Sequence, residues 1–128
     1  MKIEKFEDLI CWQLSRELSK MIYGFIKKPN FSRDFELVGQ MRDSSGSVMD
    51  NIAEGFERGG NKEFINFLFI SKASNAELRS QLYRAIDNNY INQSDFKTAY
   101  DLSINVRKNL IKLIESLKGR PNNGMKNW

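Results

Sequence analysis

The chain contains 128 residues, of which 41% are hydrophobic and 28% charged, and its mean hydropathy is −0.53. This length suits one domain with a buried apolar core, it is too short for a second, and the composition argues against disorder along the whole chain. With no histidine and one cysteine, the chain lacks the commonest general base and cannot form an internal disulfide or a cysteine-histidine zinc site.

These absences favour a protein that is not an enzyme and that holds no cofactor and no metal ion. No apolar run reaches the roughly 18 residues of a membrane-spanning helix. Acids such as Glu4 and Glu7 occupy the N-terminal stretch where a signal peptide needs an apolar core. We therefore expect a cytoplasmic protein, and the single cysteine suits a reducing compartment without proving one.

The net charge of +4 is distributed unevenly along the chain. Residues 97–128 contain seven bases and two acids, whereas residues 1–96 carry a net charge of −1. A basic final quarter is expected in a protein that faces a polyanion or an acidic partner. It is about equally expected of a solubilising surface followed by a loose tail.

Helical periodicity covers nearly the whole chain, and both prolines, Pro29 and Pro121, lie outside the periodic segments. The first helix is predicted from about residue 8 to residue 27, ending before Pro29. Its apolar stripe includes Cys11, which we interpret as a small core residue rather than a nucleophile. The second helix is predicted to begin after Ser32 as its N-cap and to end around residues 58–60.

A line of polar side chains follows one face of the second helix at steps of four and three residues. An apolar stripe lies one residue along, so this helix has two distinct faces. Because buried polar groups must find partners, we favour bonds among these residues, to a helix terminus or to a neighbouring subunit over contact with a ligand. This polar seam consists of Gln40, Ser44, Ser47, Asn51 and Glu54.

The third helix is predicted from about residue 62 to residue 88, with Asn61 as its N-cap. Its first two turns are apolar on nearly all sides, which exceeds the stripe of about 100° that one bundle core can use. Such surface usually marks a subunit interface, so we expect a homo-oligomer; the alternative is a monomer with an unusually deep core. The interface candidates outside the polar seam are Ile65, Phe69 and Ile70.

The fourth helix is predicted from about residue 95 to residue 118, capped by Asn92 or Ser94. Its apolar positions alternate steps of three and four, and only Ser103 interrupts them. Residues 1–118 are thus expected to form one bundle domain, followed by a flexible C-terminal tail at residues 119–128. The candidate phosphate contacts on the fourth helix and the tail are Arg107, Lys108, Lys112, Lys118 and Arg120.

Short connections make consecutive long helices antiparallel, so the expected fold is all-α, an up-down-up-down antiparallel four-helix bundle. A turn at Gly59 and Gly60 would place the second and third helices side by side. On this register we predict an ion pair between Arg42 of the second helix and Glu77 of the third.

Several short motifs follow one another in a recognisable order. They are FEDL at residues 6–9, WQ at 12–13, QMR at 40–42, SV at 47–48, NIAEG at 51–55, ERG at 57–59, KEF at 62–64, FL at 67–68, Ser74, and EL at 77–78. This order resembles that of the small four-helix-bundle proteins known as 23S rRNA-intervening-sequence proteins. The resemblance covers roughly residues 6–117 and is strongest between residues 40 and 78.

The resemblance implies a bacterial, cytoplasmic bundle that assembles as a ring, typically a homopentamer, with no established catalytic activity. Some relatives are encoded within inserts in large-subunit ribosomal RNA genes. A more distant, similarly built group serves as accessory proteins of diversity-generating retroelements, which bind reverse transcriptase and nucleic acid.

Taken with the basic final quarter, these associations lead us to expect an oligomeric RNA- or DNA-binding accessory protein that contacts phosphates through basic residues. The alternative is a protein-interaction scaffold that docks a partner such as a reverse transcriptase without contacting nucleic acid. The weaker candidate phosphate contacts, from the family motif, are Arg42, Arg58 and Lys62.

Overall fold

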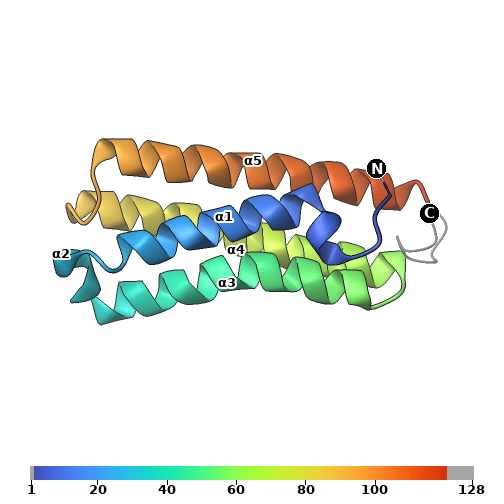
Figure 1. Cartoon of the computed structure of the whole chain (residues 1–128), viewed down its shortest axis with the longest axis horizontal. Coiled ribbons are helices and arrows are strands. Elements are labelled where there is room, and N and C mark those ends of the chain that lie inside the picture. Colours follow the sequence, from blue (N-terminus) through green and yellow to red (C-terminus); the bar gives the residue numbers. More distant parts are fainter. Residues whose placement is uncertain (1, 121–128) are drawn as a thin grey trace.

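The structure is a computed structural model that describes residues 2–120. All secondary structure in this range is helical, which confirms the all-α prediction, and four long helices lie side by side (Figure 1). The predicted C-terminal tail lies outside the described residues, apart from Gly119 and Arg120. The elements are η1 (Phe6–Asp8, a 3-10 helix), α1 (Ile10–Phe25), α2 (Pro29–Ser32), α3 (Phe35–Glu57), α4 (Asn61–Asp87) and α5 (Gln93–Lys118).

The start of α3 differs from the prediction because a short helix precedes it. Pro29 is the first residue of α2, where its missing N–H costs no hydrogen bond. Ser32 is the last residue of α2, and its hydroxyl donates to the Pro29 carbonyl at 2.9 Å. Asp34 therefore caps α3 in place of Ser32, its carboxylate accepting the N–H of Leu37 at 3.1 Å.

The two later helix starts give one correction and one confirmation. Gly60, not Asn61, occupies the N-cap position of α4, and Asn61 is the first buried residue of the helix. The Asn61 side-chain amide donates to the Leu117 carbonyl at 3.4 Å. Asn92 caps α5 as predicted, accepting the N–H of Asp95 at 2.7 Å.

The core lies between the four long helices. Helix α4 packs against α3 and α5, and α1 packs against the same two helices from the other side. Fully buried residues come from each of them, including Leu18 of α1, Met41 of α3, Leu78 of α4 and Leu110 of α5. No helix among residues 2–120 is long and apolar enough to cross a membrane.

Helices α3 and α4 approach closely where α3 ends. A Cβ on Gly55 would lie 2.7 Å from the Phe67 Cβ and 3.0 Å from the Phe64 Cδ1, so only glycine fits here without movement. The following turn passes through Gly59, whose φ of +95° lies in the region that glycine favours. Together these two glycines let the chain reverse while the two helices stay in contact.

The predicted ion pair between Arg42 and Glu77 is wrong, since it is absent from the ion pairs that residues 2–120 form. The Arg42 guanidinium instead lies 5.8 Å from the ring centroid of Tyr23 on α1. Arg42 follows Gln40 by two residues, which is a rotation of about 200° around the helix. Because Gln40 faces α4, Arg42 faces away from it.

Candidate nucleic-acid interface

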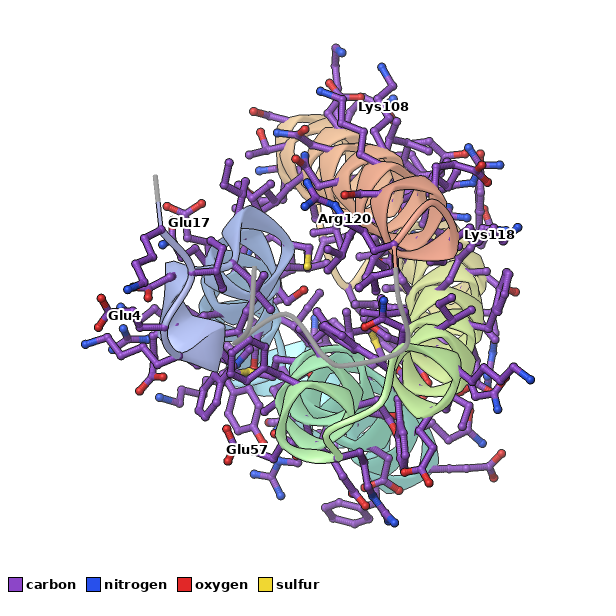
Figure 2. The ribbon with its side chains drawn as sticks, turned by 90° about the vertical axis from the view of Figure 1, so that its right-hand side faces the viewer. Glu4, Glu17, Glu57, Lys108, Lys118 and Arg120 are labelled. Atoms are coloured by element: carbon purple, nitrogen blue, oxygen red, sulfur yellow. The ribbon has the colours of Figure 1, made fainter. Side chains whose placement is uncertain are left out.

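The predicted basic residues of α5 are all exposed, but they do not form one surface. Arg107 faces α4, whereas Lys112 lines an apolar hollow that α5 forms with η1 and α1. Five residues separate the two side chains, a rotation of about 140° around the helix. Figure 2 shows Lys108 and Lys118 pointing away from the bundle on different sides of α5, with Glu4, Glu17 and Glu57 on the other side of the molecule.

A basic concave site lies between α4 and α5. This α4–α5 hollow has a volume of about 320 Å³. Two alanines leave the space open, and none of the described residues that line it is acidic. The ion pairs formed within residues 2–120 include none of its three bases. Its lining residues are Phe69, Lys72, Ala73, Ala76, Arg79 and Arg107.

A buried polar network holds one of these bases in place. The Arg79 guanidinium donates to the Ser103 hydroxyl at 3.1 Å, and that hydroxyl donates to the Asn75 side-chain carbonyl at 2.7 Å. The Asn75 amide in turn donates to the Ser103 carbonyl at 2.9 Å. Asn75 and Ser103 are both fully buried, so these bonds fix the register of α4 against α5 and orient Arg79.

One aromatic side chain lines the hollow and another lies a helical turn beyond it. Phe69, in the lining, is 46% exposed, and the Lys118 ammonium lies 5.9 Å from its ring centroid while also pairing with Glu115 at 3.5 Å. Tyr83 follows Arg79 by four residues on α4; it is 49% exposed and packs edge-on against Tyr100 with ring centroids 5.8 Å apart. A hydrogen bond with Tyr100 raises the pKa of Tyr83, so Tyr83 stays neutral at physiological pH.

The polar seam faces α4 over most of its length. Gln40 accepts a bond from the Arg84 guanidinium at 2.7 Å, and the Ser44 hydroxyl donates to Gln81 at 2.5 Å. The Ser47 and Ser74 hydroxyls are 2.8 Å apart. Residue numbers rise from 40 to 47 along this part of α3, while those of the bonded residues fall from 84 to 74 along α4.

The other two seam residues bond within α3. The Asn51 amide donates to the Ser47 carbonyl at 2.8 Å, and Glu54 pairs with Arg58 at 2.8 Å. All five seam side chains therefore have a partner inside this chain. The seam pairs α3 with α4, and it presents no set of unsatisfied groups to a ligand.

The three bases from the family motif lie away from the α4–α5 hollow. Arg42 covers Tyr23, as described above, and Arg58 lies 5.1 Å from the Phe67 ring centroid while pairing with Glu54. That hydrogen bond to Glu54 raises the pKa of Arg58. Lys62 is exposed at the start of α4. Arg42 and Arg58 are thus engaged with neighbouring side chains.

The three apolar interface candidates on α4 have different surroundings. Ile65 is half-buried and packs against the bundle's own core. Phe69 lines the α4–α5 hollow, whereas Ile70, 49% exposed, lies four residues before Ser74 on the α3 side of the helix. These neighbours therefore expose apolar surface in two different directions.

Metal ligands and the single thiol are the remaining groups that bear on reactive chemistry. Within residues 2–120, no group of three or more acids and cysteine could hold a metal ion. Burial raises the pKa of the Cys11 thiol to about 12, so it stays protonated at neutral pH. A second polar hollow of about 370 Å³ lies between α3 and α4, where Arg84 and the acids Asp43 and Glu77 contribute charges of both signs.

Sequence reasoning missed the contribution of α4 to the basic surface. Lys72 and Arg79 are one heptad apart and so share a face, a signal that was available in the sequence. Ser103 was the other signal, as the single polar residue in the apolar stripe of the last helix. Asn75, which bonds with Ser103, had no comparable signal in the sequence.

Comparison with known proteins places the chain in context. A family described as "23S rRNA-intervening sequence protein" matches residues 7–112. The chain is also similar to a crystal structure of a protein of unknown function from the S23 ribosomal protein family of Bacteroides thetaiotaomicron. The TM-score is 0.75 at 26% identity, covering 83% of this chain and 99% of that one. No curated protein matches the sequence.

Proposed function

Because the chain belongs to the 23S rRNA-intervening sequence protein family, we propose that it is a non-enzymatic, cytoplasmic accessory protein that binds RNA or DNA. It contacts phosphates through basic side chains on α4 and α5, a mode of binding that is largely independent of sequence. We further propose an up-down-up-down antiparallel bundle that assembles into a homo-oligomeric ring, with the pentamer as the expected form.

The observation that carries the nucleic-acid proposal is the α4–α5 hollow. Three bases line it without an acid among them, and none is neutralised by an ion pair within residues 2–120. Concave surfaces lined by charge of one sign concentrate the field and attract the opposite charge. In a ring the hollow is repeated once per subunit, so weak single contacts add through avidity.

The proposed subunit contact involves the exposed apolar surface of α4. About half of the Ile70 surface is exposed to solvent, beside the polar seam. The seam itself supports the bundle rather than the ring, since its side chains already have partners in this chain. The contact would therefore form around Ile70.

A second candidate function is a scaffold that docks a partner protein. The observation in its favour is the hollow of about 310 Å³ beside η1, which has a largely apolar lining including Ile3, Leu9 and Leu113. Ile10 also lines it and is 56% exposed. Apolar concavities of this kind accept side chains of other proteins. Binding of a protein after nuclease treatment, without binding of nucleic acid, would favour this function.

Salt titration of nucleic-acid binding tests the leading proposal. We expect filter binding of RNA at low salt, with affinity that falls as salt rises, because bound phosphates release counterions. Replacing Arg79 or Arg107 with glutamine should reduce the slope of log affinity against log salt by about one phosphate contact each. Lys20→Gln, an exposed lysine on α1, is the matched control and should leave the slope unchanged.

Two results would contradict the proposal. One is the absence of binding to RNA and DNA at low salt, and the other is an affinity that does not change with salt. A slope that falls equally in the Lys20→Gln control would show that net charge matters and the hollow does not.

A further inference from the structure

The outer face of α4 carries a regular pattern that phosphate contact alone does not explain. Phe69, Ala73, Ala76 and Tyr83 follow one another at steps of four, three and seven residues, so they share one face of the helix. The aromatic residues stand at the ends, about 21 Å apart along the helix axis, and the small residues lie between them. The three bases of the α4–α5 hollow flank the small residues.

From this arrangement we propose that the α4–α5 hollow binds a short stretch of single-stranded nucleic acid. Its phosphates lie against Lys72, Arg79 and Arg107, and its nucleobases stack on Phe69 in the hollow and on Tyr83, one helical turn beyond Arg79. This inference rests on the proposed nucleic-acid binding and specifies the ligand class and the site.

The aromatic residues are accessible in the way that stacking requires. Phe69 and Tyr83 each leave nearly half of their surface in solvent, although a bundle could bury them. Lys118 lies near the ring of Phe69, and Tyr83 forms an aromatic cluster with Phe96 and Tyr100. Each ring is therefore held by neighbours while part of it remains open. Bases stack on such rings irrespective of sequence, because every base has a π-face.

A single strand fits this site better than a duplex. In a duplex the bases are stacked and paired inside, so phosphates could reach the hollow but no base could reach Phe69. A single strand exposes bases and phosphates together. The site offers partners for both parts of the strand. Two exposed aromatic rings can stack with nucleobases, and three basic side chains can contact phosphates.

A helix from a second copy of this chain is the competing occupant, because alanines allow close approach of helices. A two-fold contact across this face would bring its basic side chains near those of an identical face, and the contact of the proposed ring lies at Ile70 instead. Like charges juxtaposed at an interface are strongly unfavourable. Charge complementarity therefore favours the polyanion, and the experiment includes self-association as an outcome.

The test compares two exposed phenylalanines. Phe69 and Phe35 are 46% and 82% exposed, but only Phe69 lines the hollow. Fluorescence anisotropy would measure the binding of a labelled 12-nucleotide single-stranded RNA and of a 12-base-pair RNA duplex to the full chain. We expect the wild type to prefer the single strand and Phe69→Ala to weaken that binding about 5- to 150-fold, the range for loss of one stacked base.

The controls separate stacking from charge and from folding. Phe69→Ala should leave the salt slope and the duplex affinity unchanged, and Phe69→Trp should restore single-strand binding. Phe35→Ala, which removes an exposed aromatic ring at the start of α3, should leave single-strand binding unchanged. Melting temperature and native mass would be recorded for each variant, so that misfolding or altered assembly is recognised.

Three outcomes would overturn the inference. Salt-dependent binding with no preference for the single strand, or with no loss in Phe69→Ala, would leave the proposed function standing without this site. A fall in native mass in Phe69→Ala, with unchanged single-strand affinity, would assign the face to a second copy. No binding of either RNA at low salt would reject both the inference and the proposed function.

Discussion

Arg79 shows how a surface base can be placed precisely by buried residues. Its guanidinium donates to the Ser103 hydroxyl, which is itself held by the Asn75 side chain inside the α4–α5 contact. A long cationic side chain normally loses rotamer freedom when it binds a phosphate. Because the Ser103 bond has already restricted Arg79, less freedom remains to be lost on binding.

Cys11 is the residue at which sequence and structure agree most directly. The thiol is 3% exposed, and burial raises its pKa from 9.0 to about 12. Between these pH values the unfolded chain binds fewer protons than the folded chain, so the contribution of this group to stability falls as pH rises above about 9. Burial and protonation both protect the thiol from reaction at neutral pH.

We therefore predict that the native protein does not react with a thiol reagent at pH 8, and that it reacts fully once unfolded in urea. Absorbance of the released chromophore would follow the reaction. A Cys11→Ser, Ser116→Cys double variant moves the thiol to an exposed position of α5 and should react without urea. Fast reaction of native Cys11 would show that its environment opens, contrary to its burial here.

The site residues that sequence could predict were those on one helix. Arg107 was found because α5 concentrates positive charge, but the hollow also needs Lys72 and Arg79 from α4. Their proximity depends on the register of two helices whose sequence positions differ by about 30 residues. A buried Asn75–Ser103 pair sets that register, and periodicity gives only the face of each helix.

At the scale of helices, the α3–α4 pair combines the polar seam with a close approach at Gly55. The seam supplies directional bonds that specify which residues face each other, whereas apolar packing alone would tolerate a shift. Gly55 then removes the side chain where Phe64 and Phe67 come nearest. Both features come from the stretch that carries the most specific family motifs.

We predict that Gly55→Ala destabilises the protein by about 1–3 kcal/mol, the range for overpacking, because its Cβ would lie 2.7 Å from the Phe67 Cβ. Urea unfolding followed by circular dichroism would measure the change. Gly39→Ala is the matched control in the same helix, since a Cβ there meets nothing within 4 Å. It should stabilise by about 0.5–1 kcal/mol through helix propensity. Equal effects of the two variants would contradict the close approach.

The helices themselves were predictable, and their ends were less so. Strong periodicity located the four long helices to within a few residues, and Asn92 was identified as a cap. Ser32 was a plausible cap on composition, but Pro29 starts α2 and shifts the cap to Asp34. Arg42 was assigned to the wrong neighbour because the predicted register ignored its position around the helix.

At the scale of the whole molecule, positive charge is concentrated in the last quarter of the chain. Residues 97–128 carry a net charge of +5, whereas residues 1–96 carry −1. In Figure 2, Lys108 and Lys118 of α5 stand on a different side of the molecule from Glu4, Glu17 and Glu57. Such asymmetry orients a protein on a polyanion, because one side is attracted while the other is repelled. It also allows the basic sides of several subunits to act together, provided that the subunits assemble through other surfaces.

The proposed assembly would decide how the basic surface is used, and Ile70 provides its test. We predict that light scattering of nuclease-treated wild-type protein gives a multiple of the 14.9 kDa chain mass, with five copies as the expected number. Ile70→Asp should lower that mass, because a charge cannot be buried in an apolar contact without a partner.

Phe69→Ala is the control and should leave the mass unchanged, since Phe69 faces the α4–α5 hollow. A wild-type mass of 14.9 kDa after nuclease treatment would contradict the ring. A larger mass that disappears only with nuclease would mean that nucleic acid, rather than Ile70, joins the subunits. In that case each chain would bind its own segment of the strand, and the salt dependence of assembly would match that of RNA binding.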